Sequence, residues 1–262
     1  MRAERPALIV ALHGCRQDAE DFAAGTRLDE VGERYGAVVL YPEQDLRANG
    51  HRCWNWFLPE NQHRTGPEPG AILEVVAEVS REHALESADV ILLGLSSGGS
   101  LAAILAEQCP DIFHGVGIMA GVPLHVASDE AGAYAAMRGE VTPSRLSLAR
   151  LPARESGRFR NSRAIVWTGR EDQRVAPRNA ELLAMQFRGL FGLHQYPAQE
   201  EVVDDGRIVR WRDYWGKPRV ELREIDGVGH AWSGGSLRGS FTAPDRPDAS
   251  TEMVRFLIGE SR

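Results

Sequence analysis

The stretch from Val90 to Glu107 reads VILLGLSSGGSLAAILAE, and it combines the three features that decide the fold. The apolar run Val90 to Leu93 predicts a buried strand, and Ser100 to Glu107 has the composition of a helix. Between them, residues 94–98 form the pattern Gly-x-Ser-x-Gly. A serine on a sharp turn from strand to helix extends its hydroxyl beyond the sheet, where it can attack a carbonyl carbon. Glycine and serine are common in ordinary turns, so the pattern gains its meaning from the strand and the helix around it.

Two further reactive side chains follow Ser96 in the chain. Asp172 lies in the loop after the apolar run 164–167, and His230 lies in a glycine-rich loop after the run 220–225. The order Ser, Asp, His is that of α/β-hydrolases, whose active sites gather at the carboxyl ends of the strands. The pattern predicts Ser96 as nucleophile, His230 as the base that takes its proton, and Asp172 as the group that orients the imidazole.

Each of these assignments has an alternative. Glu171 is adjacent to Asp172 and is a direct rival as the acid, and Asp226 is a weaker one. A single histidine is usually structural, and the chain contains eight. The turn at Ser96 could also be a tight turn without chemistry. Three reactive residue types after three strands favour the triad over these alternatives.

Acyl transfer also requires hydrogen-bond donors for the negative charge that develops on the carbonyl oxygen. Ser97 offers its backbone N–H at the N-terminus of the predicted helix. The loop after the first strand, His13-Gly14-Cys15, should supply the second donor, which we assign to the N–H of Cys15. The alternative for the His-Gly pair is another tight turn.

Three tryptophans lie in loops at the predicted active-site end of the sheet. They are Trp54 and Trp56 in the stretch CWNWF, and Trp232 shortly after His230. Such residues are usually part of the core, but in these positions they could also form an apolar wall for a substrate. We assign all three to an apolar pocket near Ser96, and a place in the core stays open as the alternative.

Composition bounds the class of protein. The 262 residues are 43% hydrophobic and carry a formal net charge of -7, without a basic cluster that would indicate nucleic acid. No apolar run approaches the roughly 20 residues of a membrane span. The run at residues 7–12 is too short for a secretory signal peptide and predicts a strand. Neither Cys-x-x-Cys nor histidine-rich metal spacing occurs, so we expect no metal. From the charge and the short apolar runs, we expect neither a nucleic-acid nor a membrane partner.

Apolar runs and amphipathic stretches alternate along the chain. This pattern predicts a single α/β domain over residues 1–262, with a mostly parallel, doubly wound sheet covered by helices on both faces. We expect strands at residues 7–12, 37–41, 89–93, 116–120, 163–168 and 219–225, and helices at 19–35, 70–83, 99–107, 178–191 and 249–258. Residues 202–214 predict a β-hairpin around Asp205-Gly206. Residues 121–162 are a possible lid or insertion, or surface structure without a role.

The chain resembles the esterases of the poly(3-hydroxybutyrate) depolymerase family, which are relatives of feruloyl and acetylxylan esterases. The matching stretches span nearly the whole chain, and those with tryptophan are the most specific: LHGC at 12–15, LYPEQ at 40–44, CWNWF at 53–57, GLSSGG at 94–99, residues 169–177, GHAWSGG at 229–235 and PDAS at 247–250. Members usually carry an additional segment before the first strand, and alanine is commoner where this chain has Ser97.

The resemblance implies an α/β-hydrolase fold, ester hydrolysis without a cofactor, and Ser96, Asp172 and His230 as the triad. It favours Asp172 over Glu171. It also implies an extracellular enzyme. No signal peptide is visible in this sequence, so a cytoplasmic location stays open.

The leading hypothesis is therefore a serine carboxylic-ester hydrolase that forms an acyl-enzyme with short hydroxyalkanoate esters. The substrate would be a small ester, a polyester or a polysaccharide ester, and no obligate protein partner is evident. A feruloyl or acetylxylan esterase is the alternative, because the triad and the oxyanion hole would be the same. A hydrolase-fold binding protein without catalysis is a third hypothesis, but such a protein would be expected to have lost a triad member.

The three cysteines give a further prediction. Cys15 follows the first strand and Cys53 lies in the loop after the second, so both should lie at the active-site end of the sheet, close enough for a disulfide. Such a bond would hold the Cys15 N–H in place and would fit an oxidising compartment. Two reduced thiols are the alternative. Cys109, near the far end of the helix after Ser96, should be remote from both.

Overall fold

The computed structural model describes residues 7–85, 89–140 and 157–258. Within them lies an eight-stranded sheet in the order β2-β1-β3-β4-β5-β8-β7-β6. Neighbouring strands from β2 to β8 in this order pair in parallel. At the other end of the sheet, β7 pairs antiparallel with β8, and β6 pairs antiparallel with β7. This confirms the predicted fold class and the hairpin. The strands are β1 (Ala7–Leu12), β2 (Ala37–Leu40), β3 (Asp89–Leu95), β4 (Phe113–Met119), β5 (Arg163–Gly169), β6 (Gln199–Val203), β7 (Gly206–Arg212) and β8 (Pro218–Ile225).

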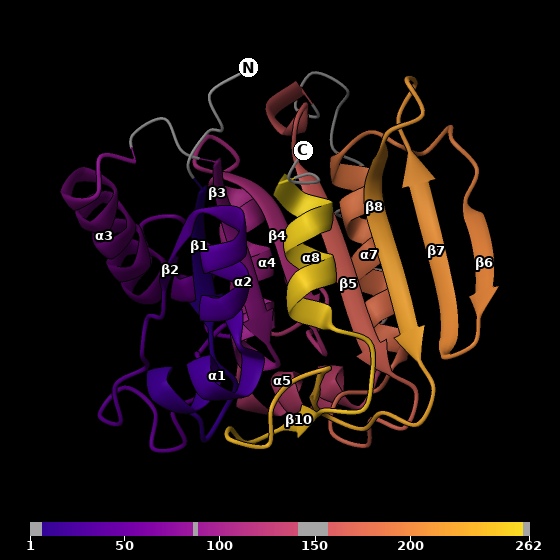
Figure 1. Cartoon of the computed structure of the whole chain (residues 1–262). Coiled ribbons are helices and arrows are strands. Elements are labelled where there is room, and N and C mark those ends of the chain that lie inside the picture. Colours follow the sequence, from indigo (N-terminus) through magenta and orange to yellow (C-terminus); the bar gives the residue numbers. More distant parts are fainter. Residues whose placement is uncertain (1–6, 86–88, 141–156, 259–262) are drawn as a thin grey trace.

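Helices cover both faces of this sheet (Figure 1). One face carries α1 (Ala19–Thr26), α2 (Leu28–Tyr35) and α8 (Ala249–Ile258), and the other carries α3 (Pro67–Glu82), α4 (Ser97–Gln108) and α7 (Arg178–Leu190). Alternate residues of β1 enter the two cores: Leu8, Val10 and Leu12 on the α4 side, and Ile9 and Ala11 on the α8 side. Since side chains alternate along a strand, only a continuous apolar run can fill both cores.

The predicted helix at residues 19–35 is two helices, which corrects the sequence interpretation. Arg27 adopts a left-handed conformation with φ 56°, and its N–H donates to the Ala23 carbonyl, which ends α1. The next helix begins at Leu28 and buries Leu28 and Val31. The spacing of apolar residues continues across the break, so periodicity alone could not detect it.

The carboxyl ends of the parallel strands meet at one edge of the sheet, the lower edge in Figure 1. Loops and short elements gather there: α5 (Glu130–Met137), β9 (Trp232–Ser233) and β10 (Thr242–Ala243). Two 3-10 helices, η1 (Pro59–Gln62) and η3 (Gly157–Phe159), complete the described elements. Part of the possible lid, residues 141–156, lies outside the described residues; the described part contains α5 and η3. Among the helices described, none has the length and apolarity that a bilayer crossing requires.

Candidate active site

Ser96 lies on the turn between β3 and α4 in a strained backbone conformation. Its φ is 56° and its ψ is -119°, a region that residues other than glycine rarely adopt. The surrounding structure holds this conformation. The Ser96 N–H donates to the Met119 carbonyl at 2.9 Å, and the Ser96 carbonyl accepts from the Ser100 N–H at 2.9 Å and the Ser100 hydroxyl at 3.1 Å. The turn therefore presents the Ser96 side chain beyond the end of the strand.

Two glycines make this turn possible. A Cβ at Gly94 would lie 2.5 Å from the carbonyl carbon of Gly98, and a Cβ at Gly98 would lie 2.2 Å from the Leu12 carbonyl oxygen. Both distances are far below any real contact of a Cβ atom. Only glycine allows the first turn of α4 to cross so closely over β3 and the end of β1. This crossing brings the N-terminus of α4 next to the loop that follows β1.

The loop after β5 supplies a buried carboxylate to the histidine loop. Asp172 Oδ2 accepts a hydrogen bond from His230 Nδ1 at 2.7 Å, and the Asp172 side chain is fully buried. The other carboxylate oxygen, Oδ1, accepts from the Arg174 N–H at 2.8 Å and the Val175 N–H at 2.9 Å. With its orientation fixed on both oxygens, Asp172 holds the imidazole with the proton on Nδ1 and leaves Nε2 as a potential base.

The rival acids lie elsewhere. Glu171 is exposed, and its backbone N–H donates to the Val228 carbonyl. Asp226 accepts a hydrogen bond from Arg170 Nη1 at 2.8 Å. The contact to His230 is thus made by Asp172 and not by either rival. Among the described residues no protein group is hydrogen-bonded to His230 Nε2 or Ser96 Oγ. Catalytic hydrogen bonds often form only once a substrate is bound.

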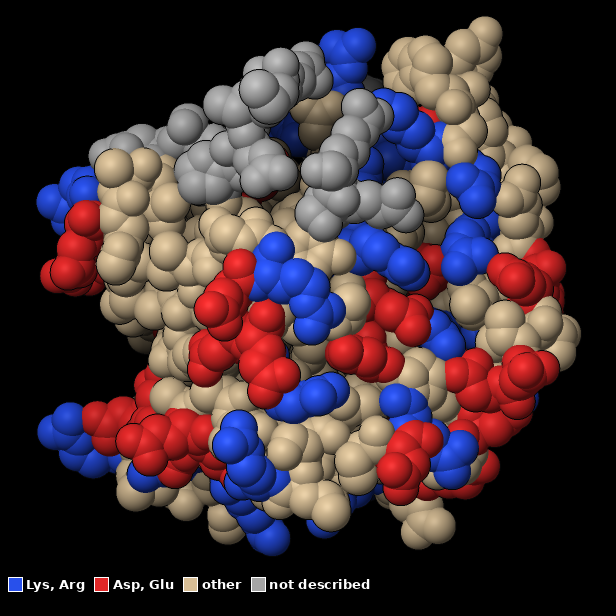
Figure 2. All heavy atoms as spheres, in the orientation of Figure 1, with Lys and Arg blue, Asp and Glu red and all other residues tan. Residues whose placement is uncertain are grey.

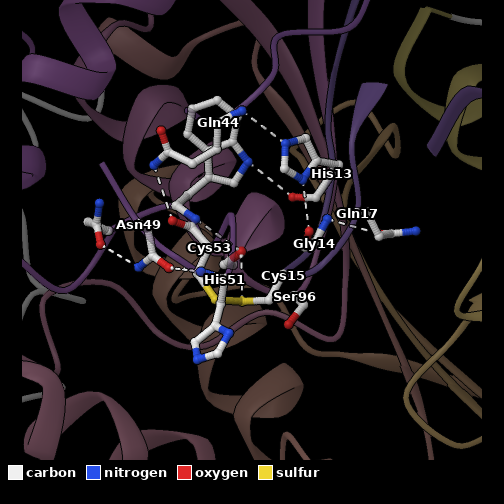
Figure 3. Close-up of a disulfide and its surroundings, with 12 residues drawn as sticks. His13, Gly14, Cys15, Gln17, Gln44, Asn49, His51, Cys53 and Ser96 are labelled. Atoms are coloured by element: carbon white, nitrogen blue, oxygen red, sulfur yellow. Dashed lines mark hydrogen bonds between the residues drawn. A yellow bond between two sulfur atoms is a disulfide. The ribbon is translucent and has the colours of Figure 1, made fainter. Parts of the chain in front are cut away.

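Two backbone N–H groups are candidates for an oxyanion hole. The Ser97 N–H is at the first position of α4, where a helix has no internal acceptor. The Cys15 N–H, in the turn after β1, also has no acceptor among the described residues. A disulfide joins Cys15 to Cys53, and Ser96 lies beside it (Figure 3). The third cysteine, Cys109, is free and buried, and burial raises the pKa of its thiol to about 11.

The hydroxyl of Ser97 has partners that the sequence did not indicate. It accepts a hydrogen bond from the Trp54 N–H at 3.3 Å and lies 3.4 Å from Cys15 Sγ. Because a disulfide sulfur carries no proton, the hydroxyl is the donor in the second contact. The Ser97 side chain therefore connects the start of α4 to both loops that the disulfide joins.

A buried histidine supports the same loop. His13 Nδ1 donates to the Gly14 carbonyl at 2.8 Å, and Nε2 accepts from the Gln44 N–H at 3.0 Å. These two contacts require a neutral imidazole, and burial lowers the pKa of His13. The His13 carbonyl in turn accepts from Trp54 Nε1 at 3.0 Å. His13 is thus a structural residue that positions its loop and the first tryptophan.

Glu68, in the first turn of α3, completes this network as a buried carboxylate. It accepts hydrogen bonds from Gln44 Nε2 at 2.6 Å and from the N–H and Nδ2 of Asn55 at 2.9 and 2.7 Å. Burial raises the pKa of Glu68. The sequence analysis missed Gln44, Asn55 and Glu68 as supporting residues. The first two lie in stretches that carry the family resemblance, which was the signal available for them.

A cavity of about 470 Å³ opens beside Ser96 between two walls. The loop wall comprises residues 13–17 and 44–57 and contributes Cys15, Arg16, His51, Cys53, Trp54 and Trp56 to the cavity. The helix wall comprises α5 and residues 174–175 and contributes Glu130, Ala133, Tyr134, Met137, Arg174 and Val175. Trp54 and Trp56 thus line the cavity, although they are only 4% and 7% exposed.

Trp232 does not line this cavity, and the prediction that it does was wrong. Its ring is 1% exposed and packs edge-on against Phe22, with ring centroids 5.5 Å apart. Its Nε1 donates to Ser250 Oγ at 2.9 Å, so the one polar atom of the ring is satisfied inside the core. Proximity to His230 in the sequence could not reveal that β9 directs this side chain toward α1 and α8.

No group of three or more histidine, cysteine or acidic side chains in the described part of the chain is arranged to hold a metal ion.

Comparison with known proteins gives a consistent result. The family model for Esterase PHB depolymerase matches residues 1–213. Poly(3-hydroxyalkanoate) depolymerase C of Paucimonas lemoignei is 29% identical over 232 residues, which are 88% of this chain and 56% of the relative. Acetylxylan esterase A of Emericella nidulans is 27% identical over 237 residues, which are 87% of this chain and 76% of the relative. The chain spans about half the length of the depolymerases that it matches.

Among solved structures, the acetyl xylan esterase from Aspergillus awamori superposes with a TM-score of 0.74 at 20% sequence identity. The match covers 97% of this chain and 90% of that one. At this level of identity the similarity concerns the fold.

Proposed function

The chain belongs to the Esterase PHB depolymerase family and has the α/β-hydrolase fold, and from this premise we propose that it hydrolyses short hydroxyalkanoate esters through Ser96, His230 and Asp172. The observation that carries the proposal is the buried contact from Asp172 to His230 at 2.7 Å, at the same edge of the sheet as the strained turn at Ser96. The relatives named above are a depolymerase and an esterase, which supports catalysis over the third hypothesis of a binding protein without activity.

The proposed reaction has two steps. His230 Nε2 takes the proton of Ser96 as the hydroxyl attacks the ester carbonyl, and the imidazolium that forms is stabilised by Asp172. The oxyanion accepts hydrogen bonds from the N–H groups of Ser97 and Cys15. His230 then protonates the departing alcohol, and an ester remains between Ser96 and the acyl group. A water molecule, activated by His230, releases the acid and restores Ser96.

The cavity supports short substrates. Its volume of about 470 Å³ is within the range of sites for small molecules, and long acyl chains would extend beyond it. Trp54 and Trp56 would give it an apolar lining on the loop wall. A small ester or the end of a polyester or polysaccharide ester fits this description.

A feruloyl or acetylxylan esterase is the second candidate. The match to this chain covers 76% of the length of the acetylxylan esterase of Emericella nidulans but 56% of the length of the depolymerase of Paucimonas lemoignei. This difference in coverage favours the second candidate. The same triad and N–H donors would serve all these esters, so the difference lies in the cavity.

The disulfide between Cys15 and Cys53 supports an oxidising, extracellular location. Peptide mapping of protein from an oxidising compartment tests this. Both cysteines should resist alkylation until a reductant is added, and ready alkylation without reductant would argue for a reduced pair.

Kinetics test the proposed function. The Ser96→Ala variant should lose roughly 10⁴- to 10⁶-fold in kcat on p-nitrophenyl butyrate while its melting temperature is retained. A panel of p-nitrophenyl esters with increasing acyl length, hydroxybutyrate oligomers, methyl ferulate and acetylated xylan separates the two candidates. Near-native turnover by Ser96→Ala would exclude Ser96 as the nucleophile.

A further inference from the structure

Two arginines line the cavity without a carboxylate partner. Arg16 on the loop wall and Arg174 on the helix wall are both exposed, and neither guanidinium makes an ion pair or a hydrogen bond with a described residue. Elsewhere charges are mixed: basic and acidic side chains alternate over the face in Figure 2, and Arg207 and Arg210 of the hairpin each contact several glutamates. Among the described cavity residues the only acidic one is Glu130.

The backbone at Arg16 is in a conformation that favours glycine. Its φ is 64°, in the left-handed region, which costs an ordinary residue about 1 kcal/mol. The disulfide at the preceding residue and a 2.7 Å hydrogen bond from the Arg16 N–H to the His51 carbonyl hold it there. Persistent strain of this kind is common at functional sites. The strained position here carries an arginine that lines the cavity.

Both arginines are close to the proposed catalytic groups along the chain. Arg16 follows Cys15, the candidate oxyanion donor. Arg174 follows Asp172 by two residues, and its guanidinium lies over the Phe241 ring at 5.2 Å from the centroid. The Phe241 ring packs edge-on against His230, with centroids 6.4 Å apart. Arg16 thus lines the cavity on the wall that carries the proposed Cys15 donor, and Arg174 lines it on the wall that reaches His230 through Phe241.

An imidazole lies on the same side of the cavity as Arg16. His51 also lines the cavity, and in Figure 3 its ring extends away from the hydrogen-bonded loop residues. A guanidinium binds a carboxylate through two parallel hydrogen bonds, and Arg16 and Arg174 have those donors available.

We propose that Arg16 and Arg174 bind a carboxylate of the substrate, so that this enzyme prefers esters with a free acid near the scissile bond over neutral esters. The inference rests on the proposed function. For hydroxyalkanoates it specifies acid-terminated short oligomers, whose last unit carries a carboxylate on the alcohol side of the ester. Attraction between opposite charges accounts for the preference, and it requires no new chemical step.

The test uses two substrates that differ in the charge of the terminal group: the linear dimer of 3-hydroxybutyrate and its methyl ester. In both, the cleavage that is followed is that of the ester between the two hydroxybutyrate units. Wild-type kcat/KM should be at least tenfold higher for the free acid, and the ratio should shrink as sodium chloride is raised. Arg16→Gln and Arg174→Gln should each lower kcat/KM for the acid about tenfold and change it for the methyl ester less than twofold. Arg255→Gln, an exposed site on α8 with the same change in net charge, is the matched control and should alter neither.

Two further measurements keep the inference separate from the proposed function. Turnover of p-nitrophenyl butyrate without a preference for the acid dimer overturns the inference and leaves the function standing. Binding to the Ser96→Ala protein, followed by calorimetry, needs no hydrolysis: the acid dimer should bind about tenfold more tightly than its methyl ester. Equal binding, or equal losses on both esters in the arginine variants, would overturn the inference.

Discussion

The two walls of the cavity differ in how firmly they are fixed. The loop wall is joined by a disulfide and by the buried network of His13, Gln44, Asn55 and Glu68. The helix wall is anchored through its backbone, where Asn179 Nδ2 donates to the Ala136 carbonyl, but it presents exposed side chains such as Tyr134, which is 53% exposed. Under the proposed mechanism, the fixed wall is the one that carries the Cys15 N–H donor, and the helix wall offers exposed side chains for contacts with the substrate.

After the loss of Ser96 itself, a change in the contact between Asp172 and His230 should have the largest effect on kcat. Asp172→Asn provides an amide where Nδ1 requires an acceptor, and kcat should fall by roughly 10⁴-fold. Glu171→Gln is the matched control, since Glu171 is exposed and next in the chain, and it should stay within a few-fold of wild type. Steady-state kinetics of both variants on p-nitrophenyl butyrate measure these losses. A larger loss from the Glu171 change would contradict the assignment of the acid.

Removal of the disulfide tests the loop wall directly. The double variant Cys15→Ser with Cys53→Ser should lose roughly 10- to 100-fold in kcat because the Cys15 N–H is no longer held. The bond spans 38 residues, and its loss should lower the free energy of unfolding by about 4 kcal/mol. Cys109→Ala is the control for activity, since Cys109 is free and buried. Unchanged kcat in the double variant would show that the bond serves stability alone.

Changes on the helix wall should have smaller effects, and these should appear in KM and not in kcat. Tyr134→Ala should change KM by roughly two- to fivefold with kcat nearly unchanged, and should alter stability by less than about 0.5 kcal/mol. Met185→Ala, on α7 and also 53% exposed, should leave KM as it is. A large drop in kcat for Tyr134→Ala would mean that this wall is as tightly coupled to the chemistry as the other.

The pH dependence of stability reports on His13. Burial lowers the pKa of His13 in the folded state, so below about pH 6.5 the unfolded chain binds a proton that the folded chain resists. The neutral His13 imidazole therefore stabilises the folded state at higher pH. As the pH falls, the free energy of unfolding decreases by at most about 1.4 kcal/mol per pH unit on account of His13. Urea unfolding between about pH 7.5 and 5.5 measures this. The slope should diminish in His13→Asn and persist in His63→Gln, an exposed control.

Much of the fold followed from the sequence because its strands are continuous apolar runs that must fill two cores. The strand at Ala7–Leu12 and the helix at Ala249–Ile258 have the predicted bounds. The break at Arg27 was missed because one left-handed residue leaves the apolar spacing unchanged.

For the candidate site, the sequence predicted the positions of some residues and missed others. Ser96, Asp172 and His230 were placed at strand ends by topology, which the chain order constrains strongly. The direction of a loop side chain is set by tertiary packing, and for that reason Trp232 was assigned to the cavity although it packs against Phe22. Partners that meet only in three dimensions, such as Glu68 with Asn55, leave no pattern in the sequence.

Covalent labelling tests the central claim, that Ser96 is a nucleophile activated by His230 and held by a fixed wall. Wild-type protein, treated with diethyl p-nitrophenyl phosphate and measured as intact protein and as peptides, should gain one diethylphosphoryl group on Ser96. Ser96→Ala should gain none, and Asp172→Asn should be labelled more slowly, by roughly the factor lost in kcat. A label on another residue, or equal labelling of Ser96→Ala, would contradict the account.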